Sequence, residues 1–418
     1  MNDYIITKSD KVDEKLSFSI IFFFIIQSAN STIKSIFPNW GASTDSMLSM
    51  ISGAVILVMI LNSMRYVIKQ HSKMVVWSYL LFFVVYAISI VMNISWNMPI
   101  EVLLKESMLW TMVWWLPMGL IVYSIRNKEV LYRTLLKWSY VLSFVTLLSL
   151  IAYFDSLQLG LTRGNYNMSF SYLLLLPLLI HLNEVFEKMS VKNIIWLIVE
   201  VVAILIYGTR AALMCIAVFM FFKIISGGLN PTKRAFIVIF STVLIMSFFL
   251  GAGTLFEDLE KAGYTSRTLE MFTSGTVTSS TGRDELRGYA IELIGERPLF
   301  GYGLGGEFAV LFEKAYGLSA QYSNFSSLTP HNGILQLMMN FGVVIGGILS
   351  LWLILTIFKI NRVKDKNTKT LLFLLCSVYI IPALIVSDGI FIKPGIALYV
   401  FLFLNRNYSI NNKQYLYE

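Results

Sequence analysis

The chain is poor in charge for its length. Only 14% of its 418 residues are charged, whereas 56% are hydrophobic. Soluble globular domains carry about 25% charged residues, so this composition excludes an ordinary soluble protein. We therefore interpret the chain as a membrane protein, since apolar surface on this scale is stable when it faces lipid.

Cysteine is scarce as well, and Cys215 and Cys376 both fall inside apolar runs, so the sequence predicts no disulfide and no thiolate metal site outside the membrane. Neighbouring acidic residues such as Glu257 and Asp258 point apart on a helix. We expect neither a catalytic metal nor another cofactor. The run GYGLGG at 301–306 follows no strand, so a turn is favoured over a nucleotide-binding loop.

Long apolar runs recur along the chain, and each is close to the roughly 20 residues that a membrane-spanning helix needs. They predict an all-α polytopic membrane protein with about 12 transmembrane helices. The expected spans are residues 16–37, 46–68, 74–95, 107–125, 136–156, 168–183, 191–208, 210–226, 234–252, 331–358, 370–387 and 390–405. Residues 1–252 then hold helices 1 to 9, 253–330 form one long loop, and 331–418 hold helices 10 to 12 and a C-terminal tail.

The net charge of +8 would suit a nucleic-acid partner if the basic residues formed one patch, but they alternate with the spans. Placing the N-terminus inside puts most of the 33 basic residues on the cytoplasmic side. Outside the long loop, the outward side keeps Lys34, Lys105, Arg163, Arg210 and Lys393. We therefore expect both termini in the cytoplasm, the long loop outside, the lipid bilayer as a partner and no nucleic acid.

The long loop carries the pattern of one amphipathic helix. Within RDELRGYAIELIGERP at 283–298, the apolar residues Leu286, Tyr289, Ala290, Leu293 and Ile294 recur at helical spacing, and Pro298 marks a stop. Such a helix would lie on the outer membrane surface.

Two polar features inside expected spans leave alternatives open. Glu200 lies in mid-span, where an acid is a functional candidate or a hydrogen-bond partner between helices. The run QSANSTIK at 27–34 either lines protein or a wet cavity, or ends a short span.

One histidine and several arginines fall on the outward side. His331 and Asn332 open the tenth expected span, and a neutral imidazole can accept a proton from a hydroxyl. Arg283 and Arg287 are four residues apart and so share a helix face. Guanidinium groups bind phosphate oxygens in pairs, so these arginines together with Arg210 and Arg163 could hold a diphosphate. Taken singly, such a histidine is more often a helix cap or an interface residue, and such an arginine more often reaches the lipid headgroups or forms a surface ion pair.

These segments resemble the O-antigen ligase and polymerase superfamily, which includes lipopolysaccharide ligases and Wzy-type polysaccharide polymerases. The resemblance rests on GTRAAL at 208–213, on GRDELRGYAIELIGERPLFGYGLGGEF at 282–308, and on HNGILQLMMNFGVVIG from His331. RGNYNMSFSYLLLLPLL from Arg163 is similar to an earlier arginine-containing segment of the family.

The resemblance implies a metal-independent, GT-C-like glycosyltransferase of the bacterial inner membrane, with its active site facing the periplasm or the cell exterior. Its donor would be an undecaprenyl-diphosphate-linked oligosaccharide, and a chain-length regulator protein would be an expected partner. His331 would act as the base or orient the acceptor. Arg210 and Arg283 would hold the diphosphate, with Arg163, Arg287 and Asn332 as further substrate-binding residues.

Three functions remain open from the sequence. A repeat-unit polymerase is our reading, and a ligase that transfers the glycan to lipid A core or another terminal acceptor is the nearest alternative. A multi-span transporter is an alternative of another class, but its usual internal repeats and midplane polar sites are not evident in the sequence.

Overall fold

The computed structural model describes residues 8–37, 41–94, 103–150, 168–207, 210–226, 235, 239, 282–317, 328–385, 389–391 and 393–406. Every regular element in these ranges is a helix. The chain divides into two compact units: unit 1 comprises residues 1–16, 60–128 and 280–418, and unit 2 comprises residues 17–59 and 129–279. The two units are described separately below.

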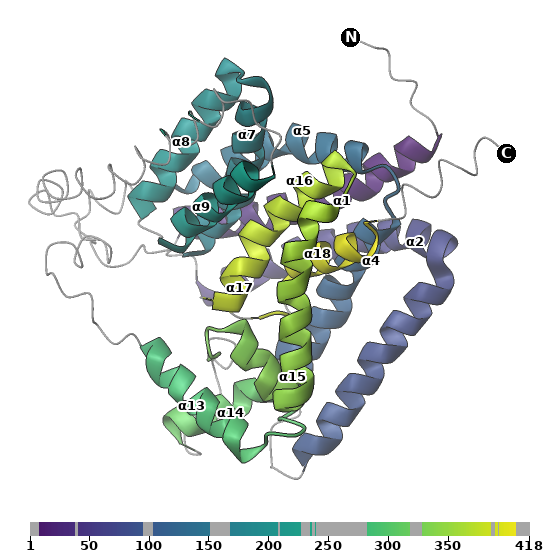
Figure 1. Cartoon of the computed structure of the whole chain (residues 1–418), viewed down its shortest axis with the longest axis vertical. Helices are drawn as coiled ribbons and strands as arrows, with labels where there is room; N and C mark the ends of the chain where they lie inside the picture. The colour runs from purple at the N-terminus through teal and green to yellow at the C-terminus, as the bar shows by residue number, and fades with distance from the viewer. Residues whose placement is uncertain are drawn as a thin grey trace, which may run out of the picture. The chain divides into compact units, whose positions relative to one another are not determined.

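Unit 2 is a helical bundle in which α7 packs against both α8 and α9 (Figure 1). Its described helices are α5 (Lys128–Leu147), α7 (Met168–Lys188), α8 (Val191–Tyr207) and α9 (Arg210–Ile225), together with most of α1 (Lys8–Ile36) and the start of α2 (Ala42–Ile94). These bounds match the spans expected over 168–183, 191–208 and 210–226. The span expected over 234–252 lies outside the described residues except for two positions.

Unit 1 contains the C-terminal helices and the described part of the long loop. Its helices are the rest of α2, η1 (Leu103–Met108), η2 (Thr111–Trp115), α4 (Leu116–Ser124), α13 (Gly282–Glu296), α14 (Gly306–Tyr316), α15 (Gly333–Lys359), η4 (Ile360–Arg362), α16 (Lys366–Leu375), η5 (Cys376–Ile380), α17 (Ile381–Ile385) and α18 (Pro394–Leu404). Helix α4 packs along α18, while α13 and α14 pack against each other and against α15 (Figure 1).

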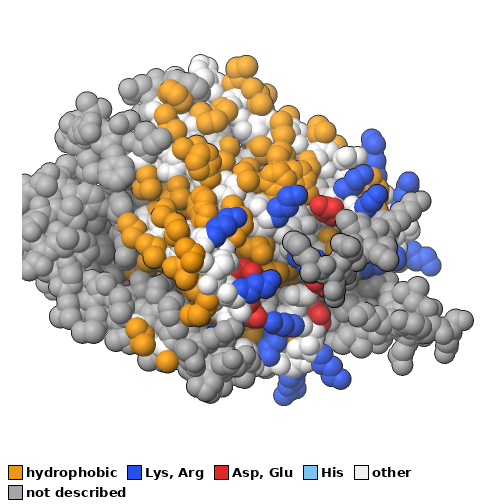
Figure 2. All heavy atoms as spheres, turned by 90° about the horizontal axis from the view of Figure 1, so that it is seen from above, with side chains coloured by type: hydrophobic (Ala, Val, Ile, Leu, Met, Phe, Trp, Pro, Cys, Tyr) orange, Lys and Arg blue, Asp and Glu red, His pale blue; other side chains and the backbone are white. Residues whose placement is uncertain are grey.

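Some of the described helices have the length and surface of membrane spans. Five are long and apolar enough to cross a bilayer: Ser9–Ile36, Ser43–Met92, Phe170–Lys188, Gly333–Arg362 and Lys366–Ile385. The face in Figure 2 carries broad hydrophobic areas, and Lys and Arg side chains gather on another part of it. Large apolar side chains stay exposed on α15, including Val344, Ile348 and Phe358, as lipid-facing residues do. The membrane class is thus supported, whereas about 12 spans and a GT-C-like arrangement remain predictions.

The two spans expected over 46–68 and 74–95 are joined in one helix, α2. Its backbone leaves helical geometry at His71, with φ −141° and ψ 42°. The loop expected between these spans is therefore reduced to a break in the helix.

The polar run of the first expected span faces protein. Ser28 Oγ shares a hydrogen bond of 2.6 Å with Thr146 Oγ1 of α5, and Thr32 Oγ1 donates to Val145 O at 3.0 Å. Both side chains are buried, so at these positions the run lines the interior of unit 2 rather than ending a span.

Helix α15 differs from the single straight span expected over 331–358, because it is broken at Gly342 (φ +75°, ψ 173°). In an unbroken helix Val343 N would donate to Met339 O. Instead Val343 N donates to Pro298 O, and Met339 O accepts from Tyr302 N, both at 2.7 Å. The chain at 298–303 thus satisfies the backbone groups that the break releases. Glycine suits this break because it adopts positive φ without steric cost.

Beyond the break, the two parts of α15 fold against each other. A Cβ on Gly346 would lie 2.5 Å from Leu337 O. Nine residues along a straight helix would separate these positions by roughly 13 Å. Residues 333–341 must therefore turn back along residues 343–359. Together with His331 and Asn332, which precede them, they are called the re-entrant segment below.

Candidate active site in unit 1

Helix α13 buries the apolar face that the sequence predicts, and it carries Arg283 and Arg287 one turn apart. Ala290 and Leu293 are buried in a cluster with Tyr302, Val310 and Met339, and the other three predicted apolar residues of α13 pack against this cluster. The helix ends at Glu296, two residues before Pro298. Burial of this face fixes α13 against α14 and the re-entrant segment, which sets where its arginines lie.

Arg287 binds the backbone at two separate points. Its Nη2 donates to His331 O at 3.4 Å and to Ile385 O, at the end of α17, at 3.2 Å. Its Nη1 lies 3.5 Å from Asp284 Oδ1. Nε is buried and makes no hydrogen bond to any described residue. One guanidinium therefore joins three segments of the chain.

His331 lies at the start of the re-entrant segment in an unusual backbone conformation. Its φ is +48°, in the left-handed region that few residues other than glycine adopt. Such conformations persist where the surrounding structure imposes them, and they cluster at functional sites. The hydrogen bond that Arg287 donates to the His331 carbonyl is one such constraint. The side chain is half-buried.

Asn332 caps the re-entrant segment. Its Oδ1 accepts hydrogen bonds from Ile334 N at 3.0 Å and from Leu335 N at 3.1 Å. This is the usual N-cap arrangement, in which a side-chain oxygen satisfies the first free amides of a helix. The capping role thus occupies the oxygen of a residue that the resemblance assigns to substrate binding.

Arg283 occupies the first turn of α13, one turn before Arg287, and its side chain is half-buried. The structure therefore brings together Arg287, His331 and Asn332, with Arg283 on the same helix as Arg287. Arg163 lies outside the described residues, and Arg210 begins α9 but its side chain is likewise outside them. Both belong to unit 2, and their roles remain predictions.

A buried carboxyl group beside this site was missed by the sequence reasoning. Glu307 is 1% exposed at the start of α14. Its Oε1 accepts from Gln336 Nε2 at 2.8 Å. With its amide in the orientation that satisfies its neighbours, Asn340 donates from Nδ2 to Glu307 Oε2 at 2.5 Å and to Gly303 O at 3.0 Å. The signal was available, since Gln336 and Asn340 are polar residues four apart in an otherwise apolar run.

Burial sets the charge state of this group. Removal from water raises the pKa of the Glu307 carboxyl from 4.5 to about 7, while the hydrogen bonds from Gln336 and Asn340 act in the opposite direction. The folded protein therefore holds this proton more tightly than the unfolded chain does. The stability that the group contributes is complete below pH 4.5 and is lost as the pH rises through about 7.

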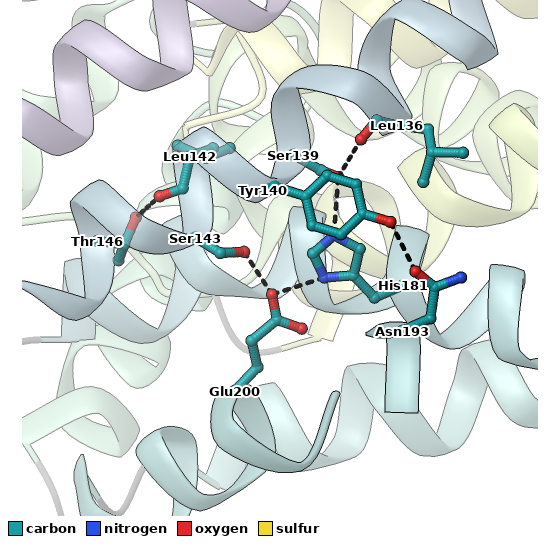
Figure 3. A network of polar contacts seen from close by, with 9 residues as sticks. All are labelled: Leu136, Ser139, Tyr140, Leu142, Ser143, Thr146, His181, Asn193 and Glu200. Atoms are coloured by element: carbon teal, nitrogen blue, oxygen red, sulfur yellow. Dashed lines mark hydrogen bonds and ion pairs between the residues drawn. The ribbon is translucent and has the colours of Figure 1, made fainter. Parts of the chain in front are cut away.

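Unit 2 holds a second buried network, shown in Figure 3. His181 of α7 lies between two helices: its Nε2 is 2.9 Å from Ser139 Oγ of α5, and its Nδ1 is 2.8 Å from Glu200 Oε1 of α8. Ser143 also donates to Glu200 Oε1, and the Tyr140 ring stacks on the imidazole with centroids 4.5 Å apart. Of the two alternatives for Glu200, the structure shows the hydrogen bond between helices.

The order serine, histidine, carboxylate in this network matches the connectivity of a hydrolytic triad. Access decides against that function, because both His181 and Glu200 are 0% exposed. A nucleophile needs contact with its substrate, so we interpret this network as a connection between α5, α7 and α8.

Within the described part of the chain, no group of three or more His, Cys, Asp or Glu side chains could hold a metal ion. The prediction of a metal-independent reaction stays a prediction, and the chemistry below is derived from arginine, histidine and amide groups.

Comparison with protein families places this site in context. A family model described as O-antigen ligase matches residues 194–351. This segment contains Arg210, Arg283, Arg287 and His331, and the match confirms the resemblance drawn from the sequence. A search of curated proteins gave no match. The matched family points to ligase-type or polymerase-type transfer in polysaccharide assembly and does not separate the two.

Proposed function

We propose that the protein is a polysaccharide repeat-unit polymerase that extends O-antigen, capsule or exopolysaccharide chains on undecaprenyl diphosphate. The match to the O-antigen ligase family over 194–351 and the apolar helices support a membrane enzyme of polysaccharide assembly. The choice of polymerase over ligase is part of the proposal. The enzyme would act in the bacterial inner membrane with both termini cytoplasmic, and a chain-length regulator would be its partner.

In the proposed reaction, a hydroxyl of the acceptor sugar attacks the anomeric carbon of the donor glycan. The bond from that carbon to the diphosphate oxygen breaks, and undecaprenyl diphosphate leaves with the bonding electrons. His331 accepts the proton of the attacking hydroxyl, and arginines stabilise the negative charge that develops on the diphosphate. Direct displacement without an enzyme-bound sugar predicts inversion at the anomeric carbon.

The observation that carries the proposal is the contact between Arg287 and His331. Arg287 Nη2 donates to the backbone carbonyl of His331, so α13 lies beside the start of the re-entrant segment although 44 positions separate the two residues in the chain. The reaction needs a cation at the leaving group and a base at the attacking hydroxyl, and this contact keeps the helix that carries Arg283 next to His331. Arg283 is assigned to the diphosphate as well, and Arg210 is proposed to join it.

The test is reconstitution. Purified protein in liposomes, supplied with undecaprenyl-diphosphate-linked repeat units and no other protein, should form polymer and release undecaprenyl diphosphate. The His331→Asn variant should bind the donor but form no polymer, while Glu313→Gln, on the outward helix α14, should match the unaltered protein. Formation of no polymer by the unaltered protein in the presence of donor would contradict the proposal.

The same preparation separates the alternatives. A ligase would leave lipid-linked repeats unpolymerised and would transfer the glycan once, to lipid A core or another terminal acceptor. A transporter would move the donor between leaflets without any new glycosidic bond. With a terminal acceptor such as lipid A core added to the preparation, product analysis by mass separates polymerisation from a single transfer, and a transporter gives neither product.

A further inference from the structure

Glu307 lies outside the arginine and histidine chemistry just described, yet it holds the segment that carries His331. Its two carboxyl oxygens face two amides, those of Gln336 and Asn340. Residues four apart share one helix face, so a single side chain of α14 binds the re-entrant segment at two successive turns.

Gln336 extends this connection to the other side of the site. Its Oε1 accepts from Gly389 N at 2.9 Å and from Ile390 N at 3.2 Å. Ile390 O in turn accepts from Trp115 Nε1 at 2.8 Å. The Gln336 amide thus has its nitrogen committed to Glu307 and its oxygen committed to the chain at 389–390, so it cannot turn over without loss of hydrogen bonds.

The Asn340 amide is committed in the same way. Its nitrogen bridges Glu307 and Gly303 O, and Gly303 N donates to Asn340 O of the backbone at 2.9 Å. The chain at 298–303 supplies hydrogen bonds at the break in α15, so Asn340 connects the re-entrant segment to these residues. Gln336 and Asn340 therefore both donate to the same carboxyl group, that of Glu307.

We propose that Glu307 is a positioning residue of the candidate active site. Its carboxyl group holds the re-entrant segment through Gln336 and Asn340, and thereby fixes the backbone at His331 and Asn332 against Arg287. This inference rests on the proposed function for its effect on rate, but the fastening itself is independent of that function.

The surroundings of Glu307 favour this role over that of a ligand-binding acid. It is 1% exposed, so no substrate reaches it. The titratable group facing it from α2 is Tyr86, whose hydroxyl is hydrogen-bonded to Ser107 and Thr111. On α13, the acids that face α14 pair with Lys314, two turns along from Glu307. The carboxyl group therefore interacts with amides rather than with a counter-charge.

The Glu307→Gln variant tests the proposal because it keeps the size of the side chain and removes one acceptor. Its amide nitrogen must face the amide of either Gln336 or Asn340, so one fastening is lost whichever way it turns. We expect kcat for transfer to fall about 10-fold with KM for the donor unchanged, because a misplaced reacting group affects the chemical step. Glu307→Asp, which keeps both acceptors, should recover part of this loss, and Glu313→Gln on the same helix should have no effect.

Hydrogen exchange supplies a readout that needs no activity. In Glu307→Gln, the amides of Gly389 and Ile390 should exchange about 10-fold faster, as expected for the loss of a buried hydrogen bond. The amides of α13 around Leu293 should keep their protection, which shows that the unit is folded. Unchanged hydrogen exchange at 389–390, or a transfer rate equal to that of the unaltered protein, would overturn the proposal. Failure of the unaltered protein to form polymer would overturn the proposed function instead, and the exchange result would still decide whether Glu307 fastens the segment.

Discussion

The buried polar network around Glu200 in unit 2 and the one around Glu307 in unit 1 differ in what they bind. In unit 2, Glu200 bonds to the side chains of His181 and Ser143, which lie on regular helices. In unit 1, Glu307 acts through Gln336 and Asn340 on irregular backbone at Gly303 and at 389–390. Both carboxyl groups are almost inaccessible, with Glu200 0% and Glu307 1% exposed.

This difference suggests that the unit 2 network contributes to stability, whereas the unit 1 network positions backbone near the candidate site. A regular helix satisfies its own backbone, so a network of side chains between helices adds only to their association. A broken helix releases backbone groups that other parts of the chain must satisfy, and such breaks occur where membrane proteins build their sites. We therefore expect changes in the unit 2 network to lower stability, and changes around the unit 1 network to lower the transfer rate.

The largest expected effect is on His331. Replacement by asparagine removes the proposed base but tolerates the positive φ at this position, so the backbone should be kept. We expect polymer formation to fall about 100-fold or more, with little change in unfolding. The rate is measured with reconstituted protein and lipid-linked donor. A variant that retains more than a tenth of the rate would remove His331 from the chemistry.

The matching change in unit 2 is His181→Leu, which should lower stability and leave the transfer rate almost unchanged. It deprives Glu200 of one of its two hydrogen-bond partners and leaves Ser139 Oγ without its hydrogen bond to the imidazole. Leaving buried polar groups unsatisfied should lower the free energy of unfolding by about 2 kcal/mol. Denaturant unfolding in detergent measures this, and the transfer rate of the folded fraction should stay within a factor of about two. A large loss of rate without loss of stability would mean that the two networks do not differ as described.

The pH dependence of stability sharpens the comparison further. The pKa of Glu307 is raised by burial from 4.5 to about 7, so its contribution to stability should fall by about 2 kcal/mol as the pH rises from 5 to 8. Glu307→Gln cannot titrate, so the difference in unfolding free energy between it and the unaltered protein should change by this amount over that range. A difference that stays constant with pH would show that this carboxyl group is not buried in the folded protein.

Part of this arrangement could be predicted from the sequence, because it depends on local patterns. Apolar periodicity located α13 and its buried face at Ala290 and Leu293, and apolar runs located α7, α8 and α18 within a few residues. The segment containing Arg287 and His331 could be recognised as similar to a family because each of its motifs is a contiguous run of residues.

The rest depends on contacts between distant segments. Whether the apolar run after His331 continues as one helix depends on the chain at 298–303, which supplies hydrogen bonds to both sides of the break at Gly342. Hydropathy is the same for a straight and a broken span, so the sequence predicted a straight one. The role of Glu307 could not be predicted for the same reason, because its partner Gln336 is 29 positions away in the chain.

The smallest effect we predict concerns Arg287, which is bound to the backbone on two sides. Arg287→Lys keeps the charge but offers one compact ammonium in place of a planar fork, so it cannot reach His331 O and Ile385 O in the same geometry. We expect the transfer rate to fall about 10-fold, less than for His331, because the histidine is displaced rather than removed. The control is Arg133→Lys, at an exposed pair with Glu129 in unit 2, which should change neither rate nor stability by a measurable amount. If Arg287→Lys were instead as damaging as loss of His331, the main role of this guanidinium would be in the chemistry rather than in holding the re-entrant segment.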